Sequence, residues 1–156
     1  MKSSNRSNRP PLAGKRILVT HAKAFMAPVL CEVLVEQGAE VILSNDALLD
    51  PEAPGALVAA TGHIDILVAN LALAAPTTPA DKVADTEWRD MFAALVDPLP
   101  RLVRAVLPQM MARRSGKILV MGSASALRGM KRASTYSAAR GAQLAYAQAV
   151  GVEVAP

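Results

Sequence analysis

The chain has little sulfur and few aromatic side chains. A single cysteine, Cys31, among 156 residues excludes an internal disulfide and fits a reducing compartment, so we expect a cytoplasmic protein. Cys31 lies in an apolar run with helical spacing, where we expect a buried, inert thiol. Aromatic residues make up only 3% of the chain. Alanine, valine and leucine must therefore form the core, which favours helices packed closely against a sheet.

The chain also lacks the features of membrane, secreted and nucleic-acid-binding proteins. No apolar stretch reaches membrane-spanning length without Pro, Gly or charge, and no apolar segment follows the basic N-terminus. The net charge is +4, but Lys2, Arg6 and Arg9 supply three of these charges. We expect a disordered polar tail over residues 1–11, a single domain over residues 12–156, and no nucleic-acid or membrane partner.

Strand-like and helix-like segments alternate along the rest of the chain. Apolar runs predict strands over 15–20, 39–44, 64–70 and 116–123, and helical spacing predicts helices over 26–38, 81–95, 98–113 and from 134 onward, with a short helix within 46–62. This alternation predicts an α/β fold, a Rossmann-like doubly wound parallel sheet with helices on both faces. The last helix would normally lead into another strand, so we expect that the C-terminal strands are missing.

The turn after the first predicted strand, "VTHAKAFMAP", contains no glycine between Thr20 and Pro28. In dinucleotide-binding proteins this turn is glycine-rich, because backbone amides must approach the pyrophosphate. Phe25 and Met26 put bulk there instead, which argues against a dinucleotide bound in the usual way. Phe25 has two open interpretations: a hydrophobic staple at the helix start, or an aromatic wall of a pocket. Asp46 is the candidate ribose-binding acid, although a solvated loop aspartate is the simpler interpretation.

Three polar residues form a candidate proton-transfer group. Tyr136 and Arg140 are one helical turn apart and share a helix face, and Ser123 ends the fourth predicted strand, where ligands bind in open parallel sheets. A guanidinium beside a phenol favours the ionised phenolate, which can then act as a base. The alternative is an ordinary Tyr–Arg pair on a helix surface.

Several segments together resemble the short-chain dehydrogenase/reductase superfamily: "HIDILVAN", "TEWRDMF", "RAVLPQMMARRSGKILVMGSAS" and "STYSAAR". Three departures from that pattern stand out. The glycine-rich turn is absent, Leu95 replaces the usual asparagine, and Arg140 replaces the catalytic lysine. These departures resemble the halohydrin dehalogenases, whose Ser-x12-Tyr-x3-Arg signature is matched by Ser123, Tyr136 and Arg140. A second signature of that family fits at Thr20 and Phe25, with Ala27 in place of its final glycine.

The resemblance implies a reaction without a cofactor. Ser123 would bind the hydroxyl oxygen of a vicinal haloalcohol, Tyr136 would take its proton with help from Arg140, and the oxygen would displace the halide to close an epoxide. The reverse reaction would open epoxides with small anions. The implied pocket residues for halide and substrate are Thr20, Phe25, Leu73, Pro76, Ser125 and Leu127, and the implied assembly is a homotetramer.

Two further interpretations remain open beside the dehalogenase. An NAD(P)-dependent oxidoreductase would have to bind pyrophosphate with a glycine-poor turn, and a truncated, non-catalytic scaffold would pair with a longer relative. His21 and His63 have no partners at metal-ligand spacing, so we expect no metal site. The resemblance implies that Asn70, at the end of the third predicted strand, bridges backbone groups. We expect Trp88 to pack a helix.

Overall fold

The computed structural model describes residues 9–155 and contains one parallel sheet. Its strands are β1 (Arg16–Val19), β2 (Glu40–Leu43), β3 (Ile66–Ala69) and β4 (Lys117–Val120), in the order β2-β1-β3-β4. Every neighbouring pair is parallel, with register partners such as Leu18 with Ile42 and Leu18 with Leu67. The predicted Rossmann-like α/β class is therefore confirmed.

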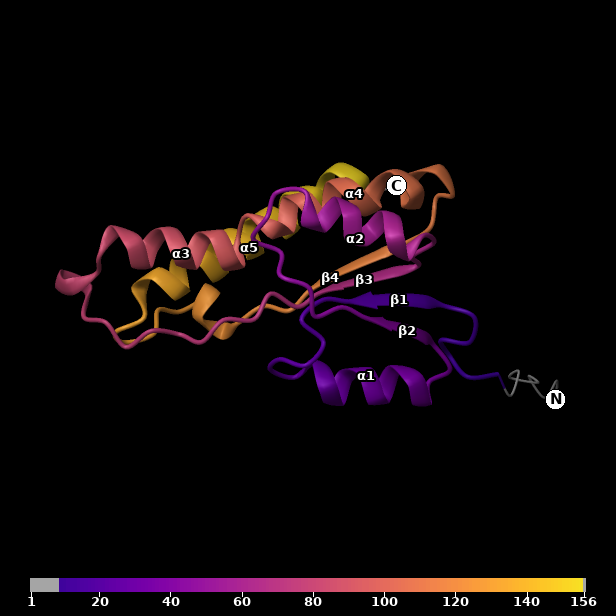
Figure 1. The fold of residues 1–156 in the computed structure, drawn as a ribbon, viewed down its shortest axis with the longest axis horizontal. Helices are drawn as coiled ribbons and strands as arrows, with labels where there is room; N and C mark the ends of the chain where they lie inside the picture. The colour runs from indigo at the N-terminus through magenta and orange to yellow at the C-terminus, as the bar shows by residue number, and fades with distance from the viewer. Residues whose placement is uncertain (1–8, 156) are drawn as a thin grey trace, which may run out of the picture.

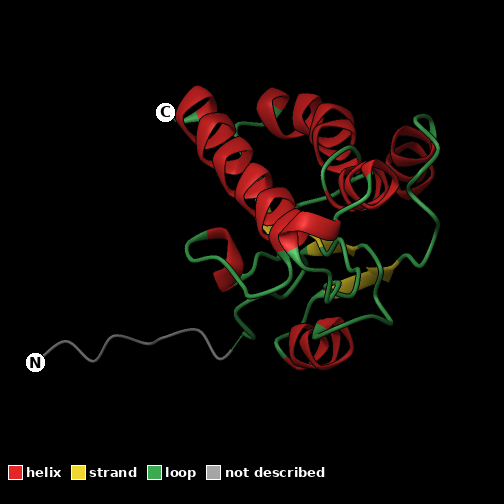
Figure 2. Cartoon of the chain, turned by 90° about the vertical axis from the view of Figure 1, so that its left-hand side faces the viewer, coloured by secondary structure: helices red, strands yellow, loops and turns green. Residues whose placement is uncertain are grey.

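Five α-helices connect and cover the strands (Figure 1). They are α1 (Ala27–Glu36), α2 (Ala53–Thr61), α3 (Asp85–Leu95), α4 (Pro98–Ala112) and α5 (Ser134–Val154), joined by short 3₁₀ turns η1 (Ala80–Lys82) and η2 (Ala124–Ala126). Helix α3 begins later than predicted, because residues 80–82 form a separate turn and Val83 is extended. Helix α1 lies on one side of the sheet, and α2, α4 and α5 lie on the other (Figures 1 and 2).

Alternating strand residues build two separate cores. Ile17 and Val19 of β1 point toward α1, whereas Leu18 between them points toward α2, α4 and α5. Cys31 packs in the α1 core with 8% of its surface exposed, and burial raises the pKa of its thiol. The interpretation of Cys31 as a buried thiol is confirmed.

The N-terminal part of the domain is tied to the end of α1. The amide of Leu12 donates to the carbonyl of Gln37 at 2.9 Å. Most of the predicted disordered tail falls on residues 1–8, outside the described residues. Over the part of the chain that is described, no helix combines the length and apolar character needed to cross a membrane.

Candidate functional site

A cavity of about 380 Å³ lies at the carboxyl end of the sheet, above the boundary between β1 and β3. The chain moves from β1 to β2 in one direction and from β3 to β4 in the other, so this boundary is the topological switch point where ligands bind in open α/β sheets. The cavity is lined by Ala24, Phe25, Ala72, Leu73, Ala74, Ala75, Tyr136 and Arg140. The loops after β1 and β3 thus form its walls, and the first turns of α5 supply its polar groups.

The turn after β1 does not fit the pyrophosphate of a nicotinamide dinucleotide. His21 and Phe25 hold left-handed backbone, with φ of 43° and 57°, where glycine would leave bare backbone. Four amides of the turn already donate within the protein: Ala22 to Ser44 O, Lys23 to Asn45 Oδ1, Ala24 to His21 O and Ala27 to Ala24 O. Pro28, in the first turn of α1, has no amide hydrogen to give. This helix start is therefore a poor anion site.

Asn70 and His21 join the two loops that line the cavity. The Asn70 side-chain amide donates to the carbonyls of His21 (3.0 Å) and Ala24 (3.1 Å), so the prediction that it bridges backbone groups is confirmed. The amide of Ala72 donates to Nδ1 of His21 at 3.2 Å. Partial burial lowers the pKa of His21 and favours the neutral imidazole, which this bond requires. The cavity walls are therefore fixed to each other by side-chain bonds.

Tyr136 and Arg140 are both buried and lie against each other on α5. Tyr136 is 9% exposed and Arg140 4% exposed. The guanidinium carbon of Arg140 is 5.0 Å from the centre of the Tyr136 ring, a cation–π distance. Within residues 9–155, the Tyr136 hydroxyl forms no hydrogen bond. A phenol beside a buried cation at a cavity wall is suited to act as a proton acceptor.

Within residues 9–155, the groups that accept hydrogen bonds from Arg140 are all neutral. Its Nη1 donates to the carbonyl of Met121, just after β4, at 3.0 Å and to Oε1 of Gln143 at 2.9 Å. The Nε2 group of Gln143, 1% exposed, donates in turn to the carbonyl of Leu95 at the end of α3. Our sequence reasoning missed Gln143. The sequence feature that could have identified Gln143 is a polar residue three positions after Arg140, on the buried face of a helix rich in alanine.

Ser123 lies on the same edge of the sheet but not in hydrogen-bond contact with Tyr136. Its Oγ accepts bonds from the Oγ of Ser125 at 2.9 Å and from the amide of Ser125 at 3.2 Å. Among the described residues, no bond joins Ser123 to Tyr136. Because the Ser123 hydroxyl accepts these bonds from Ser125, its O–H group remains free to donate a hydrogen bond to a bound molecule.

Of the other predicted pocket residues, some line the cavity and others do not. Phe25 (67% exposed) and Leu73 (42% exposed) line the cavity, so the structure favours Phe25 as a wall over a hydrophobic staple. Thr20 is fully buried, and its hydroxyl donates to the carbonyl of Asn70 at 3.1 Å. Half-buried Pro76 and exposed Leu127 do not line the cavity. Trp88 stacks on Phe92 of the same helix, with ring centres 4.5 Å apart.

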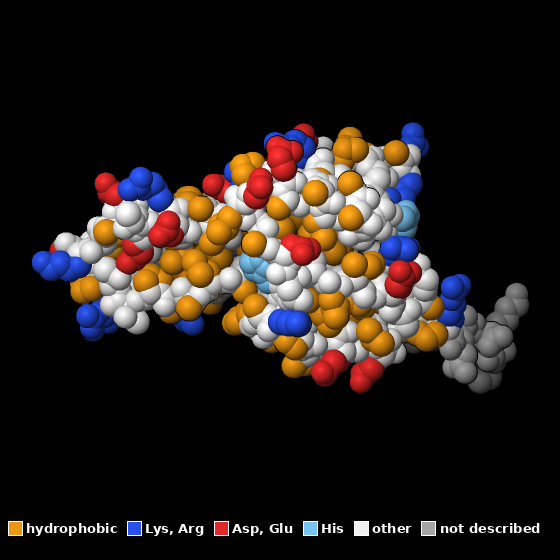
Figure 3. All heavy atoms as spheres, viewed as in Figure 1, with side chains coloured by type: hydrophobic (Ala, Val, Ile, Leu, Met, Phe, Trp, Pro, Cys, Tyr) orange, Lys and Arg blue, Asp and Glu red, His pale blue; other side chains and the backbone are white. Residues whose placement is uncertain are grey.

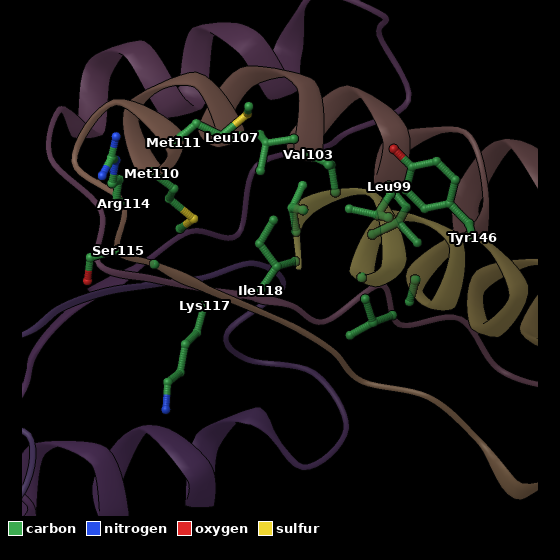
Figure 4. A pocket seen from close by; sticks show the side chains of 16 residues that line it. Leu99, Val103, Leu107, Met110, Met111, Arg114, Ser115, Lys117, Ile118 and Tyr146 are labelled. Carbon is green, nitrogen blue, oxygen red and sulfur yellow. The ribbon is translucent and has the colours of Figure 1, made fainter. Parts of the chain in front are cut away.

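A larger apolar groove, of about 690 Å³, is lined by neither Tyr136 nor Arg140. It runs between α4, the free edge of β4 and the second half of α5. Leu99, Val103, Ile118 and Tyr146 point into it, and Arg114, Ser115 and Lys117 lie at one end (Figure 4). Within the described residues, no hydrogen bond or ion pair joins the side chains of Arg114, Ser115, Lys117 and Tyr146, so the smaller cavity remains the candidate site.

Neither the surface charges nor the possible metal ligands of the described residues indicate a second functional site. On the face shown in Figure 3, basic and acidic side chains are interspersed among apolar ones. No group of three or more His, Cys, Asp or Glu residues that could hold a metal occurs in the described part of the chain.

The comparisons with known proteins define the class. The family model described as short chain dehydrogenase matches residues 51–156, so the chain belongs to the short-chain dehydrogenase family. It is 28% identical to the 3-oxoacyl-[acyl-carrier-protein] reductase FabG of Vibrio harveyi, over 92% of this chain and 69% of that protein.

Two solved structures share the fold. A structure described as a dehalogenation enzyme is 28% identical, with a TM-score of 0.78 over 89% of this chain and 68% of that one. The crystal structure of gox2181 superposes with a TM-score of 0.87 at 21% identity, over 93% of this chain and 68% of that one. The second likeness concerns the fold alone.

Proposed function

We propose that the chain carries the active site of a cofactor-independent dehalogenase, which converts vicinal haloalcohols to epoxides with release of halide and opens epoxides with small anions in the reverse direction. The observation that carries this proposal is the buried Tyr136–Arg140 pair at a cavity whose bounding turn does not fit a pyrophosphate. The 28% identity to the dehalogenation enzyme supports the same conclusion.

The reaction follows from the chemistry of these side chains. Tyr136, with the Arg140 guanidinium beside it, takes the proton of the substrate hydroxyl, while the Ser123 hydroxyl donates a hydrogen bond to the same oxygen. The oxygen forms a bond to the neighbouring carbon as the carbon–halogen bond breaks, and the halide leaves with the bonding electrons. Tyr136 then passes the proton to water. One haloalcohol thus yields one epoxide, one halide and one proton.

The cavity walls suit the rest of the substrate. Exposed Phe25 and Leu73 offer apolar surface beside the pair, which fits the carbon–halogen end of a small molecule. The walls are fixed to each other through His21 and Asn70, so the substrate would be held in one orientation. Alignment of the oxygen with the carbon–halogen bond is a proximity effect.

The experiment measures halide and proton release from a simple vicinal bromoalcohol without nicotinamide. We expect the parent chain to release both in equal amounts and Tyr136→Phe to lose about 10²- to 10⁴-fold in rate. Because no hydrogen bond is recorded for the Tyr136 hydroxyl, the variant should unfold at nearly the parent's urea concentration. Equal rates in the two proteins would contradict the proposal.

A second candidate is an NAD(P)-dependent reductase. The family match and the similarity to FabG favour it, whereas the amides of the β1 turn do not. Fluorescence titration with NADH and NADPH tests it directly. Cofactor binding with carbonyl reduction, and no halide release, would establish the reductase, while a folded chain with neither activity would indicate a non-catalytic scaffold.

A further inference from the structure

Among residues 9–155, Gln143 is the only side chain that accepts a hydrogen bond from the Arg140 guanidinium. The guanidinium also donates to a backbone carbonyl, that of Met121. No carboxylate forms an ion pair with Arg140 within the described chain, and the Nε of Arg140 is buried without a hydrogen-bond partner there. The positive charge is therefore buried and balanced only by dipoles.

A neutral partner has a chemical consequence that a carboxylate would not have. Glutamine Oε1 fixes the orientation of the guanidinium without cancelling its charge, so the cation stays available to an anion beside it. Gln143 is itself fixed, because its Nε2 donates to the carbonyl of Leu95. A continuous chain of bonds thus runs from the end of α3 through Gln143 and Arg140 to the end of β4.

Two other titratable groups near this end of the sheet are engaged elsewhere. Glu87 of α3 accepts hydroxyl bonds from Thr78 at 2.6 Å and from Thr135, the neighbour of Tyr136, at 2.8 Å. His21, from the β1 turn, accepts the Ala72 amide. Neither is bonded to Arg140.

We propose that Gln143 is the positioning residue of this site, which keeps Arg140 oriented and electrostatically uncompensated beside Tyr136. The inference rests on the proposed function, because the role of Gln143 is to hold the Arg140 guanidinium beside Tyr136, the proposed proton acceptor. It also makes a prediction about Tyr136 that requires no substrate.

The test introduces a carboxylate of the same shape. In Gln143→Glu the new charge pairs with Arg140, and we expect the pH at which half of Tyr136 is ionised to rise by about one unit. The chain has two tyrosines, so the phenolate absorbance is followed in a Tyr146→Phe background, where Tyr136 titrates alone. Below that pH, a one-unit rise leaves about tenfold less phenolate, so kcat should fall about tenfold with little change in KM.

The matched control is Gln109→Glu. Gln109 also accepts a bond from a guanidinium, that of Arg113, at 3.1 Å, but no tyrosine is recorded in contact with that arginine. We expect the Tyr136 titration to stay at the parent's pH in this variant. An unshifted titration in folded Gln143→Glu, or equal shifts in both variants, would overturn the inference.

Gln143→Met keeps a side chain of similar length and removes both hydrogen bonds without adding charge. This variant tests the positioning role if Gln143→Glu does not fold. We expect the Tyr136 titration to move in the same direction by less, and an unchanged titration would refute the positioning role. If no variant or parent turns over haloalcohols but the titrations shift as described, the proposed function fails while the role of Gln143 stands.

Discussion

Two arginines at opposite ends of the sheet are held in the same way. Arg140, at the carboxyl end, donates to Gln143 and to the carbonyl of Met121. Arg113, after α4 at the amino end, donates to Gln109 Oε1 and to the carbonyl of Ile64. In each pair the side-chain amide of the glutamine donates to a further backbone carbonyl, that of Leu95 in the first pair and that of Gly62 in the second.

The difference lies in what else each guanidinium contacts. Arg140 is almost fully buried, lies against the Tyr136 ring and lines a cavity. Arg113 is half-buried and bonds only to backbone and to Gln109 in the described structure. The same arrangement therefore ties the end of α4 to the segment before β3 at one end, and at the other it holds the cation that we propose to act in the reaction. A buried arginine by itself indicates neither role.

The largest expected effect separates the two arginines by activity. Replacing Arg140 with methionine removes the cation beside Tyr136, and we expect halide release to fall by about 10²- to 10³-fold. The free energy of unfolding should also fall, by about 1–3 kcal/mol, because the Met121 carbonyl and Gln143 Oε1 lose their donor. Steady-state halide release measures the effect, and a variant with the parent's rate would remove Arg140 from the reaction.

The next effect concerns Arg113 and is one of stability. Arg113→Met leaves the carbonyl of Ile64 without its side-chain donor and breaks the bond to Gln109. We expect a loss of about 1–3 kcal/mol in the free energy of unfolding, with halide release unchanged. Urea denaturation followed by circular dichroism provides the value. A loss of activity without a loss of stability would mean that the two pairs do not differ as described.

The smallest effect tests a fully paired charge at the amino end. Asp65 accepts the Arg16 amide at 2.9 Å and pairs with His63 at 3.2 Å and Lys15 at 3.7 Å; the amide bond is the main reason that its pKa is lowered. Because the pKa is lower in the folded state, this carboxylate stabilises the fold above the ordinary pKa of about 3.9, and the contribution is lost as pH falls through the folded value.

We therefore expect Asp65→Asn to cost about 1 kcal/mol at neutral pH. The difference from the parent should shrink as pH falls below about 4, where the parent loses the same contribution. Urea unfolding at several pH values checks this. A constant difference over the whole range would show that the charge of Asp65 is not responsible.

The sequence was sufficient for the strand and helix order, because each element has a clear apolar period and short polar links. It also predicted the Tyr136–Arg140 pair, since a spacing of four on one helix is decided locally. The Asn70 bridge was expected from the resemblance to the short-chain dehydrogenase/reductase superfamily. The start of α3 was less well predicted, because an isolated 3₁₀ turn has no periodic signal.

Contacts between distant segments were the part that the sequence could not give. Gln143 is 48 residues from its partner Leu95, and only the packing of α3 against α5 brings them together. The spacing predicted that Ser123 would lie near Tyr136. It could not predict the hydrogen bonds between Ser123 and Ser125, because these depend on the backbone of a short turn. Thr20 fits a family signature, yet tertiary packing directs its hydroxyl to Asn70.

The proline in the first turn of α1 has a practical consequence for protein engineering. A designer who wished to install nicotinamide chemistry on this scaffold would begin by placing glycines at positions 21 and 25, where the backbone is left-handed. Those changes would make room for a phosphate but would not supply the amide that Pro28 lacks. The conversion would therefore have to include Pro28, and a library that varies only the loop would omit a required position.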